Sequence, residues 1–343
     1  MKAVLHRTFG GTEVLEVVDV PEPVPGPADV VVGVRATSLN RLDVLQRQGP
    51  PLLPGFELPH IAGMDIAGEV LAVGADVEEV ETGTRVVVNP AVHCGECRAC
   101  RAGDDAFCPD VKVVGGNHPG GYAEQVVVPA THVYRLPDDM DFATAAALPT
   151  VYSTAWHALV ATAGLRIGEW VMIHAAASGV SVAAIQLAKR MGAQVVATAG
   201  SEPKLALARR LGADVVVDNR RGDVVGAARQ VTGGRGVDVV FDHVGPALFQ
   251  LSLYALRPRG RLVFCGSTTG EDATFNLPHA YHFGMQLLGA DPYSYAEFGE
   301  MLAFVLEAGF DPVIDRVYPL ADVAEAQRRL EAGDVLGKLV LVP

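Results

Sequence analysis

The stretch at residues 170–192, WVMIHAAASGVSVAAIQLAKRMG, decides the fold of the middle of the chain. It begins with a continuous apolar run, as expected for a strand that is buried on both faces. A turn of small residues follows, and then a helical pattern that ends at Gly192. A strand, a tight turn and a helix in this order predict the first βα unit of a parallel sheet.

The sequence after this stretch continues to alternate between predicted strands and predicted helices. Apolar strands are predicted at AQVVATAG, ADVVVDN, VDVVFDHVG and GRLVFCG, with helical text such as SEPKLALARRLG between them. Strands that alternate with helices predict an α/β fold with a doubly wound parallel sheet. After about residue 294, two helical segments and a closing strand, GKLVLVP, end the chain.

The first 150 residues show a different sequence pattern. Short apolar runs such as VVVGVRA, IAGEVLAVG and TRVVVNP are separated by clusters of Pro, Gly and Asp. This pattern is typical of a β-rich domain of Greek-key or barrel type. Because 343 residues exceed the usual size of a single core, we expect two domains.

Composition narrows the class of protein. The formal net charge of −13 argues against a nucleic-acid partner. The N-terminus lacks the apolar run of a signal peptide. The most apolar long window, residues 170–188, contains His174, Ser178 and Gln186, so it is interpreted as buried structure and not as a membrane span. We therefore expect a soluble, cytoplasmic protein with no membrane partner.

Four of the five cysteines lie close together, at Cys94, Cys97, Cys100 and Cys108. Clustered cysteines without a secretory signal favour a metal over disulfides. Four thiolates complete a tetrahedral zinc shell and leave no open position for a substrate. The long gap before Cys108 fits an iron–sulfur run poorly. The spacing predicts one structural zinc per chain, and Cys265 is predicted to be an inert core residue.

The small-residue turn of the first βα unit is a candidate nucleotide site. It carries Gly179 but not the full G-x-G-x-x-G pattern, so a plain βα turn is an alternative. At the end of the second strand, Ser201 and Lys204 stand where NAD-binding sheets place an acid. This favours NADP(H) over NAD(H), although Ser201 could also simply cap the next helix.

Taken together, these features resemble the medium-chain dehydrogenase/reductase superfamily, which includes zinc alcohol dehydrogenases and quinone reductases. The resemblance spans the cysteine lobe, AAALPTVYSTAWHAL, the βα text after residue 184 and GKLVLVP. It implies a GroES-like catalytic domain at residues 1–150 and 295–343, with a structural zinc lobe at about 93–109. It also implies a Rossmann domain at residues 151–294, and hydride transfer with a nicotinamide cofactor held in the interdomain cleft.

The chain departs from the zinc alcohol dehydrogenases at their catalytic metal. The positions of its three ligands correspond here to Asn40, Met64 and Thr150, none of which is a good zinc ligand. Asp65 is the carboxylate that remains nearby. NRLDVLQRQG, from Asn40, resembles the metal-free quinone-reductase branch, although Asn40 and Asp43 could instead organise a turn and cap a helix. Asn40, Thr150 and Asp65 are the candidate catalytic residues.

The resemblance also assigns residues to the cofactor. It implies Thr154 beside the nicotinamide, Gly179 and Val180 at the pyrophosphate, Ser201 and Lys204 at the adenosine end, Asn219, Val244, Gly266 and Ser267 along the remaining length, and Lys338 at the pyrophosphate. His174 is instead predicted to be a core histidine. The family commonly forms dimers through an edge strand, for which residues 285–293 are the candidate, so a homodimer or homotetramer is expected.

Three functions follow from these observations. The leading hypothesis is an NAD(P)H-dependent reductase of a quinone or conjugated carbonyl that works without catalytic zinc, with Asn40 bonding the substrate oxygen. The alternative is a zinc-containing NAD(P)-dependent alcohol dehydrogenase that acts on a small alcohol or aldehyde. The third is a nucleotide-binding protein without enzyme activity.

Overall fold

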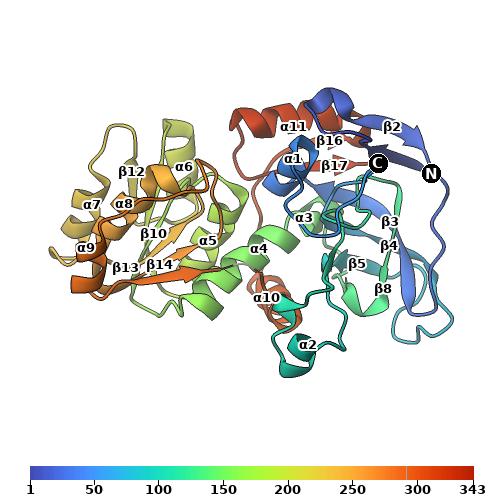
Figure 1. The fold of residues 1–343 in the computed structure, drawn as a ribbon, viewed down its shortest axis with the longest axis horizontal. Helices are drawn as coiled ribbons and strands as arrows, with labels where there is room; N and C mark the ends of the chain where they lie inside the picture. Colours follow the sequence, from blue (N-terminus) through green and yellow to red (C-terminus); the bar gives the residue numbers. More distant parts are fainter. Residues whose placement is uncertain (291) are drawn as a thin grey trace. The chain divides into compact units, whose positions relative to one another are not determined.

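The computed structural model describes residues 1–290 and 292–343, and the chain forms two compact units (Figure 1). The first unit comprises Met1–Thr150, Ser294–Ala303 and Asp311–Pro343. The second comprises Val151–Tyr293 and Phe304–Phe310. Both ends of the chain therefore belong to the first unit.

The first unit is built on a mostly antiparallel sheet with the strand order β16-β17-β3-β4-β5-β9, to which β8 adds by pairing with β3. These strands are β3 (Asp29–Ser38), β4 (Asp65–Val73), β5 (Arg85–Val88), β8 (Gln125–Pro129), β9 (Val133–Arg135), β16 (Ile314–Pro319) and β17 (Lys338–Val342). Only β16 and β17 pair in parallel among the described strands of this sheet. The β-rich prediction for this part of the chain is confirmed.

Shorter elements complete this unit. Two further two-stranded sheets pair β1 (Lys2–Leu5) with β2 (Glu16–Asp19) and β6 (Ala91–Val92) with β7 (Lys112–Val113). The helices are α1 (Arg41–Gln48), α2 (Arg98–Ala102), α3 (Phe142–Ala146), the first part of α10 (Tyr295–Ala308) and α11 (Val323–Ala332). A valine-rich core lies between the strands, with Val30, Val32 and Val86 at 1% exposure or less.

The second unit contains the predicted parallel sheet, in the order β12-β11-β10-β13-β14-β15 (Figure 1). Its strands are β10 (Trp170–Ile173), β11 (Gln194–Ala199), β12 (Val215–Asp218), β13 (Val237–Asp242), β14 (Leu256–Phe264) and β15 (Gln286–Gly289). Numbered along the chain this is the order 3-2-1-4-5-6 of a Rossmann fold, in which the strand order reverses between β10 and β13. A ligand crevice is expected at the carboxyl ends of these two strands.

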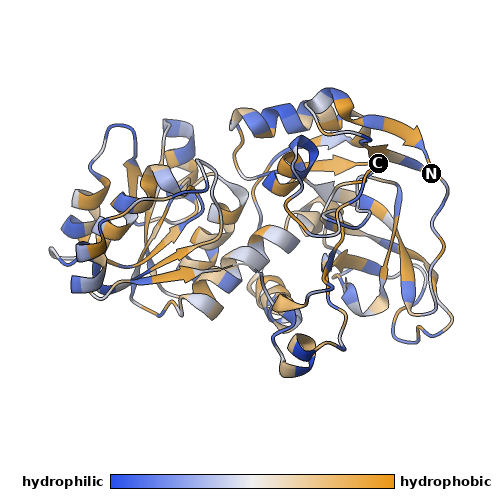
Figure 2. Ribbon diagram, in the orientation of Figure 1, coloured by the Kyte–Doolittle hydropathy of each residue, from blue (hydrophilic) through white to orange (hydrophobic). Residues whose placement is uncertain are grey.

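The helices of the second unit alternate with its strands. They are α4 (Pro149–Trp156), whose first two residues belong to the first unit, a π-helical turn (His157–Thr162), α5 (Gly179–Arg190), α6 (Glu202–Arg210), α7 (Val224–Val231), α8 (Pro246–Ala255) and α9 (Leu277–His282). The strands form because their apolar runs are covered on both faces, and Figure 2 shows them as predominantly hydrophobic. Among the described residues, no helix is both long and apolar enough to cross a bilayer.

Candidate functional site

The buried carboxylate of Asp65 gathers the predicted catalytic residues of the first unit. Asp65 opens β4 and is fully buried. Its Oδ2 accepts hydrogen bonds from Ser38 Oγ at 2.8 Å and Asn40 Nδ2 at 2.9 Å. Its Oδ1 accepts from the Thr150 backbone N–H at 2.8 Å and from Thr150 Oγ1 at 2.5 Å. The structure thus brings together Asn40, Asp65 and Thr150, which the sequence proposed separately.

Strand register explains this convergence. Ser38 at the end of β3 pairs directly with Asp65, and Val340 of β17 pairs with Ser38 from the other side. Asn40 follows two residues after Ser38, at the start of α1. Thr150 lies in the first turn of α4, so the negative carboxylate meets the positive end of that helix.

Lys338 closes the cluster. Its Nζ donates to Leu39 O at 2.7 Å, Asn40 Oδ1 at 2.8 Å and Asp65 Oδ2 at 3.0 Å, so all three ammonium hydrogens have an acceptor. The Lys338 side chain is 4% exposed. Burial alone would raise the pKa of Asp65, but the Lys338 ammonium and the hydrogen bonds from Thr150, Asn40 and Lys338 hold that pKa below its usual range. Asp65 and Lys338 therefore form a buried ion pair.

Lys338 was expected at the cofactor's pyrophosphate, and that role stays a prediction. In the structure its ammonium belongs to the Asp65 cluster, which sequence reasoning missed. Ser38 was missed as well, although it stands two residues before Asn40 on a predicted strand. The resemblance places both ends of the chain in one domain, but it does not indicate which strands of that domain pair, and so it does not bring Lys338 to Asp65.

Asp43 organises the helix next to this cluster. Its Oδ2 accepts from the Asn40 backbone N–H at 2.8 Å and from Tyr122 Oη at 2.9 Å. Burial raises the pKa of Asp43 to about 6. The interpretation of Asp43 as a helix-capping residue is confirmed. The loop before Asp65 needs Gly63, which has φ 101° and whose Cβ would stand 2.8 Å from the Tyr122 backbone N.

A second zinc does not fit this cluster. The resemblance places the three ligand positions at Asn40, Met64 and Thr150, which carry an amide, a thioether and a hydroxyl, whereas zinc prefers thiolate, imidazole or carboxylate. The one carboxylate, Asp65, is already bound by an ammonium and four other hydrogen bonds. Within residues 1–290 and 292–343, the metal-capable group of His, Cys, Asp or Glu side chains is the cysteine cluster.

The cysteine cluster fits a structural zinc. The Sγ atoms of Cys94, Cys97, Cys100 and Cys108 all lie within 4.8 Å of one another, and Cys94 and Cys100 are 3.9 Å apart. Zinc–sulfur bonds of about 2.3 Å in a tetrahedron imply sulfur–sulfur distances of about 3.8 Å. Backbone N–H groups donate to Cys94 Sγ at 3.3 Å and to Cys97 Sγ at 3.4 Å. None of these four cysteines is in a disulfide.

The first βα turn of the second unit lies where a dinucleotide pyrophosphate is expected. Gly179 and Val180 are the first residues of α5, and Ser178 caps this helix by accepting from the Ser181 N–H at 3.2 Å. Ala175 in the turn has φ 47°, a conformation that is uncommon for a non-glycine residue. The turn thus presents the amino end of α5 at the carboxyl end of β10.

The adenosine end would lie beside β11 and β12. Ser201 occupies the N-cap position of α6, but its side chain makes no capping hydrogen bond. Lys204 lies in the first turn of α6. Asn219 follows β12, and its backbone N–H donates a hydrogen bond to Ala199 O at 3.0 Å. Sequence reasoning missed Arg220, whose Nε lies 2.8 Å from where a Cβ on Gly200 would be.

The other predicted cofactor residues follow β13 and β14. The Val244 N–H donates to Asp242 Oδ1 at 2.7 Å. Gly266 and Ser267 come directly after β14, and a Cβ on Gly266 would stand 3.0 Å from His243 O. Thr154 lies in α4. Apart from Thr154 and Lys338, the residues predicted to bind the cofactor lie at the carboxyl edge of this sheet or in the turns and helix starts that follow it.

His174 is a satisfied core histidine, as predicted. It is fully buried, with Nδ1 2.8 Å from Thr198 Oγ1 and Nε2 3.0 Å from Ser252 Oγ. Burial lowers the pKa of His174 to about 4, although Asp242 opposes this. The imidazole is therefore neutral at physiological pH.

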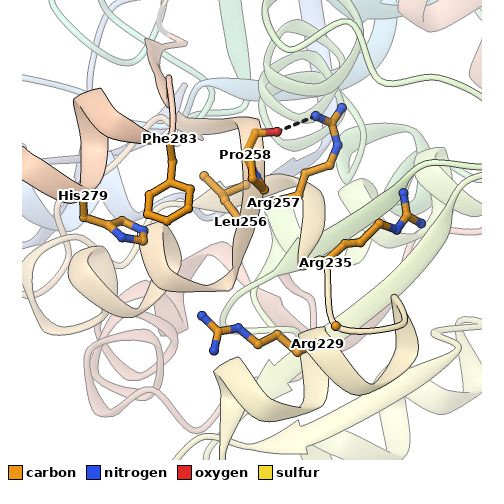
Figure 3. A pocket seen from close by; sticks show the side chains of 8 residues that line it. Arg229, Arg235, Leu256, Arg257, Pro258, His279 and Phe283 are labelled. Carbon is orange, nitrogen blue, oxygen red and sulfur yellow. Dashed lines mark hydrogen bonds between the residues drawn. The ribbon is translucent and has the colours of Figure 1, made fainter.

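A separate surface pocket of about 460 Å³ lies elsewhere on the second unit (Figure 3). Arg229, Arg235, Arg257, His279 and Phe283 help to line it. It adjoins the first residues of β14 and the loop before β13, at the amino edge of the sheet. It contains none of the predicted cofactor residues and is therefore not the dinucleotide site.

Two family models match this chain. One, described as a zinc-binding dehydrogenase, matches residues 179–330, and the other, an alcohol dehydrogenase GroES-like domain, matches residues 26–138. A quinone oxidoreductase of Pseudomonas aeruginosa is 33% identical over 100% of this chain and 99% of its own length. An NAD-dependent alcohol dehydrogenase of Sulfolobus acidocaldarius is 33% identical over 99% of each. A crystal structure of an NAD-dependent alcohol dehydrogenase is 43% identical, covers all of both chains and superposes with a TM-score of 0.96.

These comparisons correct the leading functional hypothesis. The chain resembles the alcohol dehydrogenase structure at 43% identity, above its 33% identity to the quinone oxidoreductase, and it carries the four-cysteine zinc cluster. The expected reductase of a quinone or conjugated carbonyl is therefore wrong, and the alternative, a zinc-containing alcohol dehydrogenase, is favoured. The error arose because the substrate was inferred from Asn40, Met64 and Thr150. These residues bear on whether a catalytic metal binds and do not identify the substrate.

Proposed function

Since the chain belongs to the medium-chain dehydrogenase/reductase superfamily and is an NAD(P)-dependent oxidoreductase, we propose that it is a zinc-containing alcohol dehydrogenase. It interconverts a small alcohol and its aldehyde or ketone. The observation that carries this proposal is the 43% identity, over the full length of both chains, to a structure of an NAD-dependent alcohol dehydrogenase. The zinc is that of the cysteine lobe, where it contributes to folding.

The Asp65 cluster supplies the polar groups for the reaction. The bound nicotinamide supplies the hydride acceptor or donor. Thr150 Oγ1 donates to Asp65 Oδ1, so the Thr150 oxygen can take the hydroxyl proton of an alcohol while its own proton passes to Asp65. The amide of Asn40 stabilises negative charge on the substrate oxygen. Before the transfer, Lys338 keeps Asp65 ionised and fixed in place, so that Asp65 Oδ1 can accept the proton from Thr150; in the reverse direction the same proton returns through Thr150 to the substrate oxygen.

NADP(H) is the proposed preferred cofactor. The end of β11 carries Ala199, Gly200 and Ser201 and therefore lacks the acid that would repel a 2′-phosphate. The Ser201 hydroxyl does not cap α6, Lys204 stands one turn further on, and the Arg220 side chain lies against Gly200. A hydroxyl after β11, a cation in the first turn of α6 and a cation after β12 suit a phosphate.

A homodimer, or a tetramer of such dimers, is the proposed assembly in the cytoplasm. Strand β15 forms one edge of the parallel sheet and offers unpaired backbone groups to a second copy. The preceding segment exposes Leu277, Tyr281 and Phe283 at 64%, 66% and 44%. Of the segment predicted for this contact, residues 285–293, residue 291 lies outside the described residues.

A turnover panel tests the proposed activity. Small primary and secondary alcohols are offered with NADP⁺ or NAD⁺, and aldehydes, quinones and enals are offered with NADPH or NADH. We expect reversible alcohol–carbonyl turnover, and slower turnover in Thr150→Val. Turnover confined to quinones or enals, or an unchanged rate in Thr150→Val, would contradict the proposed substrate or the proposed proton path, respectively.

A further inference from the structure

His243 connects the two halves of the Rossmann sheet at the point where its strand order reverses. It follows β13 directly, and its Nε2 lies 2.8 Å from Ser181 Oγ and 3.1 Å from Ser178 Oγ. Both serines belong to the turn and first residues of α5, after β10. The His243 imidazole thus links the segments that follow the neighbouring strands β10 and β13.

The hydrogen-bond directions fix which atom donates. The Ser178 hydroxyl donates to Ser181 Oγ at 3.0 Å, and the Ser181 hydroxyl donates to His174 O at 2.7 Å. In this arrangement both hydroxyl hydrogens have acceptors, and the tautomer that satisfies the remaining contacts carries its hydrogen on Nε2 of His243, which then donates to the serine oxygens. Burial lowers the pKa of His243, which is consistent with a neutral imidazole.

A buried network holds the loop that carries His243. Asp242 Oδ1 accepts from the N–H groups of Val244 at 2.7 Å and Gly245 at 3.0 Å. Asp242 Oδ2 accepts from Ser252 Oγ at 3.0 Å, and Ser252 also contacts His174. Since Asp242 and Ser252 are fully buried, the loop has a rigid base and the imidazole a defined direction.

We propose that His243 is a positioning residue for cofactor binding, which holds the first βα turn in the conformation that receives the dinucleotide pyrophosphate. The pyrophosphate binds to N–H groups at the amino end of α5, and Ser178 and Ser181 fix the direction of those groups. His243 restrains both serines from the opposite side of the crevice. This inference concerns the dinucleotide site alone and is independent of the alcohol substrate.

Equilibrium binding of NADPH and NADH to the full-length, zinc-loaded protein tests this role. His243→Leu removes the donor, His243→Asn has an amide too short to reach the serines, and His243→Gln places an amide N–H near the position of Nε2. The matched control is His282→Leu, at an exposed histidine on α9. Kd is measured by fluorescence titration, and thermal unfolding and zinc content are measured in parallel.

We expect His243→Leu and His243→Asn to raise Kd about five- to tenfold for NADPH and NADH alike, because the pyrophosphate is common to both. His243→Gln should stay within about twofold of the parent, and His282→Leu should not change Kd. Parent-like Kd in a folded His243→Leu or His243→Asn protein would overturn the proposal. So would an equal loss in His243→Gln, since only the shape of the ring would then matter. If His243→Leu does not fold, the Asn and Gln variants still decide.

Discussion

Replacing Lys338 by methionine should destabilise the first unit strongly. The change keeps a long side chain but leaves the Asp65 carboxylate buried without its countercharge. Removing one partner of a buried ion pair costs about 3–5 kcal/mol. Four hydrogen bonds to Asp65 remain, from Ser38, Asn40 and two from Thr150, so we expect the lower end, about 3 kcal/mol. At about 2–4 °C per kcal/mol, the Tm should fall by about 6–12 °C.

The matched control is Lys189→Met. Lys189 pairs with Asp214 at 2.7 Å, but these side chains are 28% and 34% exposed, against 4% and 0% for Lys338 and Asp65. An exposed pair contributes at most about 1 kcal/mol. The double variant Asp65→Asn/Lys338→Met removes both charges and should be more stable than Lys338→Met alone.

Thermal and denaturant unfolding between pH 3 and 7 measure these effects. Since the folded-state pKa of Asp65 lies below its usual value of 3.8, the stability from the pair is fully present above about pH 4 and is lost as the pH falls through the folded-state pKa. The difference between the parent and Lys338→Met should therefore narrow in acid. A loss at pH 7 no larger than that of Lys189→Met would refute the reasoning.

Three further expectations follow from the sites described above. Metal analysis should give one zinc per chain, and the Cys97→Ser variant should lose this zinc and have a lower Tm. A second zinc that resists desalting would contradict the conclusion that Asn40, Met64 and Thr150 bind no metal. The Kd should be lower for NADPH than for NADH, and Lys204→Ala or Arg220→Ala should reduce the difference between the two Kd values. Equal Kd values in the parent protein would disprove the preference for NADP(H). Burial raises the pKa of Asp43 from 3.8 to about 6, so the parent should lose about 3 kcal/mol of stability as the pH rises through that range, and Asp43→Asn should lack this slope in denaturant unfolding.

The parallel sheet could be predicted because its signals are local. Each strand is a continuous apolar run, and each helix begins after a turn of small or capping residues such as Ser178 and Asp223. The cysteine cluster was equally accessible, because its four ligands lie within fifteen residues of sequence and thiolates have few other roles in that spacing.

The Asp65 cluster could not be predicted as a unit. Lys338 and Asp65 are 273 residues apart, and Thr150 and Asp65 are 85 apart. Their contact depends on β17 pairing with β3 and β3 with β4, and strand pairing leaves no mark on the individual residues. The same holds for His243, whose partners Ser178 and Ser181 lie on the neighbouring βα unit.

The Asp65 cluster bears directly on how an alcohol would be activated under the proposed function. A metal ion lowers the pKa of a bound hydroxyl by its charge, and that requires an open coordination position. Here the carboxylate is balanced by the Lys338 ammonium, whose three hydrogens all have acceptors, so the cluster carries no net charge. The cluster therefore acts by hydrogen bonding from Asn40 and by proton transfer through Thr150. The four-cysteine zinc therefore stabilises the fold, while proton transfer requires Asp65 to be ionised before it accepts the proton from Thr150.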